Sequence, residues 1–440
     1  MRSGKPLMVL AIVLGGLIGL YYYDQKKPAP EGGEARDKVF DVEADKIASL
    51  RIKSSAGETS SLTKEKDAWS LTAPFASRAD QSEVSGITTN LSSLQVAGVV
   101  DENPKDVKQY GLAEPRIEVA FKAGGKDRRL LIGEKTAMGG DLYARRDNEP
   151  RVFLISGYLE TTFDRKPFDL RDKSILKFDR DKVDRIEIVH DNARVEAVKS
   201  GLDWMLTAPV KARADYSAVE ALITRLQSAQ MKSVVADQAA PADLEKWELG
   251  KPAVTATVGA GSSRATLALG KGTPEGDVYA RDTSQPMVVT VGKDLLDDVN
   301  KRPDDLRRKD IFEFRPFNVS RLEITRGSDT HVFEKTKGSG DAEKWKRTAP
   351  KAADLDSGKM DDFLSKLTSL RAQSFVDQVP AGAEPAVTVA GRFDDGKRNE
   401  RVRIDRKDGD AFAIRGEEPG AARFPASELE DALKALDAVK

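Results

Sequence analysis

A tryptophan followed by the same short tail occurs three times in this chain of 440 residues. The tails are WSLTAP, WMLTAP and WKRTAP, and they begin at Trp69, Trp204 and Trp345. Their nearly constant spacing predicts one unit of roughly 136 residues written three times, because a fixed period of this kind marks tandem modules. We therefore expect three repeat domains, residues 39–173, 174–309 and 310–440, the last with a degenerate second half.

The first half of each unit predicts strands that end at the shared proline. Apolar residues at alternate positions open each unit, as in Leu50-Arg51-Ile52, which is the period of a half-buried strand. The segment that carries the tryptophan alternates in the same way. Proline has no amide hydrogen for a central ladder, so we expect that strand to end at Pro74, Pro209 and Pro350.

An aspartate stands at the same distance beyond each of these prolines: Asp80, Asp215 and Asp356. Apolar residues then follow at steps of three and four, which puts them on one face of a helix of about four turns. Aspartate is a preferred N-cap, and in the first unit Asp80 and Glu83 match the spacing of a capping box. Each aspartate therefore has a sufficient structural role.

The second half of each unit predicts an antiparallel meander. In the first unit, short strand signals cover residues 117–121, 129–132, 142–145 and 152–155, separated by Gly, Asp and Asn turns. Helical patterns close the units at residues 158–163, 294–299 and 427–436. We therefore predict the α+β class, with three antiparallel sheets and packed helices.

The N-terminus has a different character from the rest of the chain. Arg2 and Lys5 precede an uncharged, mostly apolar run over residues 7–23 that ends in three tyrosines, which suit a membrane interface. We expect residues 1–27 to form an uncleaved membrane anchor and residues 28–38 a flexible linker. A cleaved signal peptide is the alternative, but no small-residue cleavage site follows the run. The expected location is the inner membrane, single-pass, with the bulk of the chain periplasmic.

The composition excludes several classes of protein. Lys and Arg number 71 against 72 Asp and Glu, so the net charge of −1 gives no reason to expect a nucleic-acid partner. The chain has no cysteine and two histidines, His190 and His331, which fall at different places in their repeats. A zinc site or a Ser-His-Asp triad is therefore not expected. We predict no metal, no cofactor and no enzymatic activity.

Two further patterns invite a functional reading. Residues 391–398 resemble a phosphate-binding loop until Arg398 replaces its Ser or Thr, and the Asp-Asp-Gly within them favours a hairpin turn. Tyr143 with Arg145, and Tyr279 with Arg281, share a strand face in two of the units, because residues two apart point the same way. We take these four residues as a candidate binding patch, with a solvated face and a local cation–π contact as the alternative.

Several motifs together resemble the bacterial DUF4340 family, a domain of unknown function. They are Trp69 with its Thr-Ala-Pro, the helix start at Asp80, Tyr110-Gly111-Leu112 before Pro115, Gly133, Tyr143-Ala144-Arg145 and Leu170-Arg171-Asp172-Lys173. The resemblance implies an N-terminal membrane helix and a gene placed beside ABC-type exporter components of the gliding-motility type. It brings no catalytic residue.

The repeats share their structural motifs but no common set of catalytic residues, which favours an interaction protein. We expect a membrane-anchored, extracytoplasmic, non-enzymatic accessory protein of the cell envelope that works with ABC transporter subunits or other envelope proteins. One alternative is a cell-wall or polysaccharide hydrolase that uses the repeated aspartates as acid and base. The other is a glycan-binding module built on the two Tyr-Ala-Arg pairs.

Overall fold

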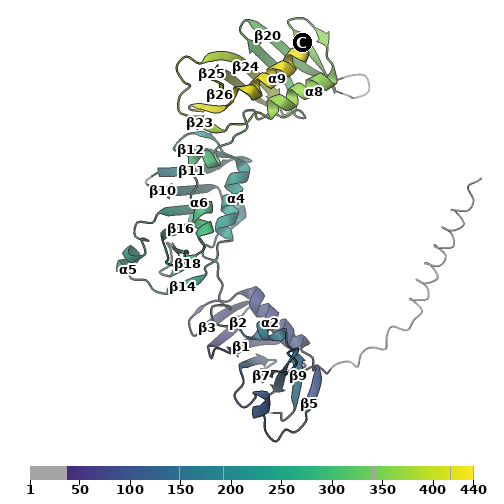
Figure 1. Ribbon diagram of the computed structural model, residues 1–440, viewed down its shortest axis with the longest axis vertical. Helices are drawn as coiled ribbons and strands as arrows, with labels where there is room; N and C mark the ends of the chain where they lie inside the picture. The colour runs from purple at the N-terminus through teal and green to yellow at the C-terminus, as the bar shows by residue number, and fades with distance from the viewer. Residues whose placement is uncertain (1–36, 148, 192, 338–342, 417, 440) are drawn as a thin grey trace, which may run out of the picture. The chain divides into compact units, whose positions relative to one another are not determined.

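The computed structural model describes residues 37–147, 149–191, 193–337, 343–416 and 418–439 (Figure 1). The predicted anchor, residues 1–27, and nearly all of the predicted linker lie outside these ranges. Among the described residues, no helix is both long enough and apolar enough to cross a membrane. The predicted location as a single-pass protein of the inner membrane is therefore corrected, because the structure gives it no support.

The chain divides into two compact units, Met1–Lys173 and Ser174–Lys440. Within the described residues, the first unit holds one sheet and the second holds two, so the threefold repetition expected from the tryptophan motif is confirmed. The division into three separate repeat domains stays a prediction.

The first sheet has the strand order β4-β3-β2-β1-β6-β7-β8-β9-β5, with every neighbouring pair antiparallel. Its strands are β1 (Ile47–Lys53), β2 (Thr59–Glu65), β3 (Ala68–Ala73), β4 (Ser77–Arg78), β5 (Gly98–Asp101), β6 (Ile117–Ala123), β7 (Lys126–Lys135), β8 (Asp141–Arg146) and β9 (Val152–Ser156).

The second and third sheets repeat this order. The second consists of β10 (Arg185–His190), β11 (Ala193–Ser200), β12 (Asp203–Ala208), β13 (Ala212–Arg213), β14 (Ser233–Ala236), β15 (Val254–Ala260), β16 (Ser263–Gly272), β17 (Val278–Asp282) and β18 (Val288–Val291). The third consists of β19 (Val319–Arg326), β20 (Asp329–Lys337), β21 (Glu343–Ala349), β22 (Ala353–Asp354), β23 (Ser374–Val376), β24 (Glu384–Phe393), β25 (Arg398–Lys407), β26 (Asp410–Arg415) and β27 (Ala421–Pro425).

One helix crosses each sheet, because it follows one edge strand and leads to the strand at the opposite edge. These helices are α2 (Gln81–Ser93), α4 (Tyr216–Gln227) and α8 (Ser357–Thr368). The shorter helices are α3 (Leu159–Phe163), α5 (Pro241–Lys246), α6 (Lys293–Val299) and α7 (Pro303–Leu306), and the 3₁₀ turns are η1 (Ala44–Lys46), η2 (Lys108–Tyr110) and η3 (Arg180–Lys182). The chain closes with α9 (Ala426–Val439), which lies beside α8 on the third sheet (Figure 1).

The core of each repeat lies between its sheet and its helices. In the first repeat, Val84, Ile87 and Leu91 of α2 pack in one cluster with Leu50 and Ile52 of β1. Equivalent stripes of α8 and α9 bury the inner face of the third sheet. We call the helix-covered face of each sheet its inner face and the opposite one its outer face.

The predicted α+β class is wrong, since the protein is mostly β, with 44% of residues in strands and 21% in helices. The helices expected after Asp80, Asp215 and Asp356 do form. However, the closing helices of the first two repeats are short, 5 residues in α3 and 7 in α6. All the strands of a repeat, by contrast, join one continuous sheet, so residues in strands outnumber residues in helices.

Candidate functional site

The outer faces of the three sheets carry the side chains that alternate with the core residues. In β19, Leu322 and Ile324 are buried on the inner face, while Arg321 and Glu323, which alternate with them, are partly exposed. Strand pairing aligns the three copies residue by residue, so the outer faces can be compared position by position. They differ in what covers them and in how their charges are paired.

Segment 102–116 covers part of the outer face of the first sheet. Tyr110 packs on Tyr143 of β8, with ring centroids 5.0 Å apart, in a small apolar cluster with Leu112 and Leu131. The segment comes so close to β7 that a Cβ added to Gly133 would lie 2.0 Å from the Tyr110 carbonyl oxygen. Glycine is therefore required at this position.

Segment 237–253, which contains α5, covers the same part of the second sheet. Trp247 packs on Tyr279 of β17 at 6.0 Å between ring centroids, in a cluster that includes Leu249 and Ala268. Here too a glycine admits the segment, because a Cβ on Gly270 would lie 2.2 Å from the Trp247 carbonyl oxygen.

The third repeat has a shorter segment, residues 377–383, and a different surface beneath it. Asp405 takes the position of Gly133 and Gly270, and Arg403 takes the position of Leu131 and Ala268. The side chain of Arg403 is 55% exposed, whereas Leu131 and Ala268 are buried. The apolar cover of the first two copies is thus replaced by an exposed arginine, Arg403, that pairs with Asp405 at 3.0 Å.

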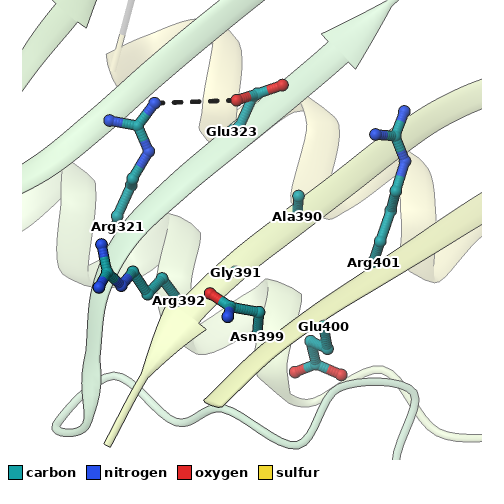
Figure 2. A pocket seen from close by; sticks show the side chains of 8 residues that line it. All are labelled: Arg321, Glu323, Ala390, Gly391, Arg392, Asn399, Glu400 and Arg401. Carbon is teal, nitrogen blue, oxygen red and sulfur yellow. Dashed lines mark ion pairs between the residues drawn. The ribbon is translucent and has the colours of Figure 1, made fainter. Parts of the chain in front are cut away.

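Next to Arg403 the outer face is hollowed, with a volume of about 550 Å³. Two cross-strand rows line the hollow: Glu323, Ala390 and Arg401 in one, Arg321, Arg392 and Asn399 in the other. Ala390 is short and its neighbours are long, so the centre of the face stays open between them (Figure 2). We call this site the basic hollow.

The charges of the basic hollow are only partly compensated. Arg321 pairs with Glu334 and, at 3.8 Å, with Glu323. Arg392 donates from Nε to the Gly396 carbonyl at 3.3 Å. Within the part of the chain that the structure describes, Arg401 is exposed and has no ion pair.

Glu400 lines the hollow through its backbone but does not neutralise it. It is buried, and its Oε1 accepts hydrogen bonds from the backbone N–H groups of Glu313 and Phe314 at 2.8 and 3.0 Å. Figure 2 shows Glu400 and Arg401 leaving β25 on opposite sides. The carboxylate therefore belongs to the inner face, and the hollow keeps an excess of positive charge.

The equivalents of Arg401 in the other copies have partners. In the first sheet the position is Arg129, which lies 3.6 Å from Glu118. In the second it is Thr266, whose hydroxyl is 2.9 Å from that of Thr257 across the strands. An unpaired cation at this position, within the described residues, is therefore particular to the third copy.

The two Tyr-Ala-Arg pairs of the candidate binding patch lie in different sheets. Tyr143 and Tyr279 are half-buried beneath Tyr110 and Trp247, where they pack against the covering segments. Arg281 donates to the Thr283 carbonyl at 2.8 Å, and the Nε atoms of Arg145 and Arg281 are buried without a hydrogen-bond acceptor in the described chain. The tyrosines thus help to hold the cover, and their use as a glycan platform stays a prediction.

The repeated motif residues have structural surroundings. Trp69, Trp204 and Trp345 are buried, and the peptide bonds before Pro74, Pro209 and Pro350 are all cis. Asp80 Oδ1 accepts from the N–H groups of Ser82 and Glu83 at 3.0 and 3.1 Å, and Asp215 and Asp356 cap α4 and α8 in the same manner, each at 3.0 Å. These carboxylates stabilise helix N-termini.

Among the described residues, no cluster of three or more His, Asp or Glu side chains is placed to hold a metal ion. The expectations of no metal and no cofactor stay predictions.

The sequence pattern points to the tyrosine pairs and not to Arg321, Arg392, Arg401 and Arg403. A signal was present in the third copy, which lacks the Tyr-Gly-Leu or Trp-Glu-Leu of the covering segment. It has Arg401-Val402-Arg403 where the other copies have Arg129-Leu130-Leu131 and Thr266-Leu267-Ala268. The segment that resembles a phosphate loop forms the end of β24, a turn over residues 394–397 and the start of β25.

The sequence profile of DUF4340, "Domain of unknown function (DUF4340)", matches residues 69–203 and 204–388. No significant match occurs among curated proteins. Two solved structures of the DNA polymerase sliding clamp from Pseudomonas aeruginosa, one with a ligand, align at 8% identity over 88% of this chain and 93% of theirs. Their TM-score of 0.17 is too low to support any statement about fold or function.

Proposed function

The chain belongs to the DUF4340 family, and we propose that it acts as a non-enzymatic interaction protein whose third sheet binds an acidic segment of a partner protein through the basic hollow. The observation that carries this proposal is the hollow on the outer face of the third sheet, where Arg401 has no ion pair within the described residues although its equivalents in the other sheets have partners. In the first two copies, apolar packing covers the neighbouring part of this face, around Leu131 and Ala268.

The charge and shape of the hollow favour carboxylates as its ligands. Arginine presents N–H donors in a planar fork that matches a carboxylate, and Arg392 and Arg401 stand on neighbouring strands on either side of Ala390. An extended acidic segment could lie across the two rows, with Ala390 leaving room for its backbone. Complementary charge at such a surface sets the specificity and the association rate more than the final affinity.

The first partner to test is suggested by the family resemblance. Genes of DUF4340 proteins often lie beside ABC-type exporter components of the gliding-motility type, so we propose such a component as the source of the acidic segment. The covered sheets of the first two copies would then act as spacers or as additional contact surfaces.

Site-specific photo-crosslinking in cells tests the proposal. A benzophenone amino acid in place of Ala390 should give a discrete adduct with one partner protein. Because Arg392 and Arg401 hold that partner, the double variant R392Q/R401Q should remove the adduct while the protein level stays unchanged.

The matched control uses Ala120, which has the position of Ala390 in the first sheet. The same probe at Ala120 should give no comparable adduct. An equal adduct from both positions, or an adduct from Ala390 that survives the double variant, would contradict the proposal.

A further inference from the structure

A second cavity lies within the unit Ser174–Lys440, between the edge of the second sheet and the end of the third. Its volume is about 890 Å³. Met205, Lys211 and Arg213 line it from the second repeat, and residues 397–401 with Arg415, Gly416 and Glu418 line it from the third. Asn399 and Arg401 line both this cavity and the basic hollow, so the two are neighbours. We call it the inter-repeat cleft.

The floor of the cleft is a network of nearly buried ion pairs. Arg213 Nε lies 2.6 Å from Glu418 Oε1, and Arg213 Nη1 lies 3.5 Å from Glu313 Oε1. Arg415 Nη1 donates to Glu400 at 2.5 Å. The side chains of Arg213, Glu313 and Glu418 are only 11 to 12% exposed. This network connects the second repeat to the third.

Positive charge exceeds negative charge in the cleft. The basic residues that line it are Lys211, Arg213, Lys397, Arg398, Arg401 and Arg415, and the acidic residues are Glu313, Glu400 and Glu418. Burial lowers the pKa of Arg213, and the neighbouring Arg415 lowers it further, against the opposing effect of Glu418 and Glu313. The carboxylates of Glu418 and Glu313 therefore do not fully offset the effects of burial and of Arg415 on the Arg213 guanidinium.

Two observations indicate that the missing negative charge would come from a ligand. Nη1 of Arg213 is buried and has no hydrogen-bond acceptor within the described residues, which is costly for a charged donor. Lys211 and Lys397, from different repeats, are both exposed and have no ion pair in the described chain.

We propose that the inter-repeat cleft binds a multivalent oxyanion, a small molecule with two or more phosphate or carboxylate groups, between Lys211 and Lys397. The lysine ammonium groups hold its outer charges, and the buried guanidiniums below attract it electrostatically. Because the two lysines belong to different repeats, the bound ligand links the second sheet to the third. This site adjoins the acidic-segment site on the outer face and shares Asn399 and Arg401 with it, but Lys211 and Lys397 belong to the cleft alone.

Isothermal titration of the full chain at constant ionic strength tests the proposal, with pyrophosphate and citrate as the two probes. We expect saturable binding of at least one of them, and the tighter of the two identifies phosphate or carboxylate as the preferred group. The variant K211Q/K397Q should weaken that binding by about tenfold or more, since two charge contacts are lost. Both side chains are exposed, so the variant should keep its fold.

The control R51Q/K122Q removes two positive charges from exposed side chains of the first sheet, and it should leave the binding unchanged. Hydrogen exchange gives a second readout, because a bridging ligand should slow exchange in residues 203–213 and in residues 397–401 together. The proposal is overturned if neither probe binds, if both double variants weaken binding equally, or if only one of the two segments is protected.

Discussion

At the scale of single residues, charged side chains fall into two groups: those that hydrogen-bond to the backbone and those that face solvent. Asp80, Asp215 and Asp356 satisfy backbone N–H groups at helix starts, while Glu400 satisfies two backbone N–H groups of the segment that leads into the third sheet. These carboxylates are occupied by the fold. Arg392, Arg401 and Lys397, in contrast, keep their charge toward solvent, and the proposed functions rest on them.

The cap role of Asp215 predicts a specific pattern of substitution effects. Asp215→Ala should lower the stability of α4 by about 1 kcal/mol, because the Ala218 N–H loses its acceptor. Asp215→Asn should leave it nearly unchanged, since asparagine caps equally well. Native-state hydrogen exchange of the α4 amides measures both. An equal loss in the two variants would show that the carboxylate has a role other than capping.

Glu160 predicts a pH dependence of stability in the first repeat. Its carboxylate is 15% exposed and contacts Lys135 Nζ at 2.6 Å and Arg116 Nη2 at 2.8 Å. The hydrogen bond from Lys135, with that from Arg116, holds the pKa of Glu160 below its ordinary value. A lowered folded-state pKa gives stability that is present above the unfolded-state pKa, about 4.3 for Glu, and is lost as pH falls through the folded-state value.

Glu160→Gln should therefore destabilise the first repeat at pH 6, and the difference from the native sequence should shrink steadily as the pH drops below about 4. The pH dependence of the unfolding free energy, followed for both proteins, measures this. A difference that stays constant down to pH 2.5 would rule out the ion-pair explanation.

At the scale of elements, the three copies differ most in the segment that leads from the edge strand to the central strand. In the first two copies it carries Tyr110 or Trp247 onto the outer face, and Gly133 or Gly270 makes room for it. In the third copy it is short, and Asp405 stands in place of the glycine. The inner face of the third sheet has its own close approach, at Gly391.

Gly391→Ala should destabilise the third sheet by about 1–3 kcal/mol, as overpacking of a filled core does. A Cβ at this position would lie 2.6 Å from Phe314 Cδ1, and Phe314 is fully buried, so it cannot move away cheaply. Gly416→Ala is the control, because nothing lies within 4 Å of a Cβ there. Hydrogen exchange of β24 and β25 compares the two, and similar values for both variants would contradict the packing argument.

The sequence predicts helices and helix caps well, but it does not predict which residues face each other across neighbouring strands. The caps at Asp80, Asp215 and Asp356 and the helices behind them follow from short-range spacing, and so does the threefold repetition. The basic hollow depends on which residues face each other across β19, β24 and β25, and the register of strands far apart in sequence is not encoded in any local pattern. The predicted α+β class is wrong because the closing helices of the first two repeats are short and add little to the helical fraction of the chain.

At the scale of the whole molecule, the chain repeats one nine-stranded sheet three times and varies its outer face. This variation lets one architecture present different surfaces, which suits an interaction protein better than a repeated catalytic centre. In the third copy the variation exposes Arg392, Arg401 and Arg403 and places the inter-repeat cleft next to them. We therefore expect binding to concentrate on the third repeat and to depend on salt, because surface charges provide it.

The central claim is that the basic hollow of the third sheet binds acidic protein segments, and the affinity of the full chain for a fluorescent glutamate-rich peptide tests it most directly. We predict saturable binding that weakens with salt, falls about tenfold or more in R392Q/R401Q and is unchanged in R51Q/K122Q, which removes the same charge from the first sheet. Equal affinities of the two double variants for the peptide would contradict the account.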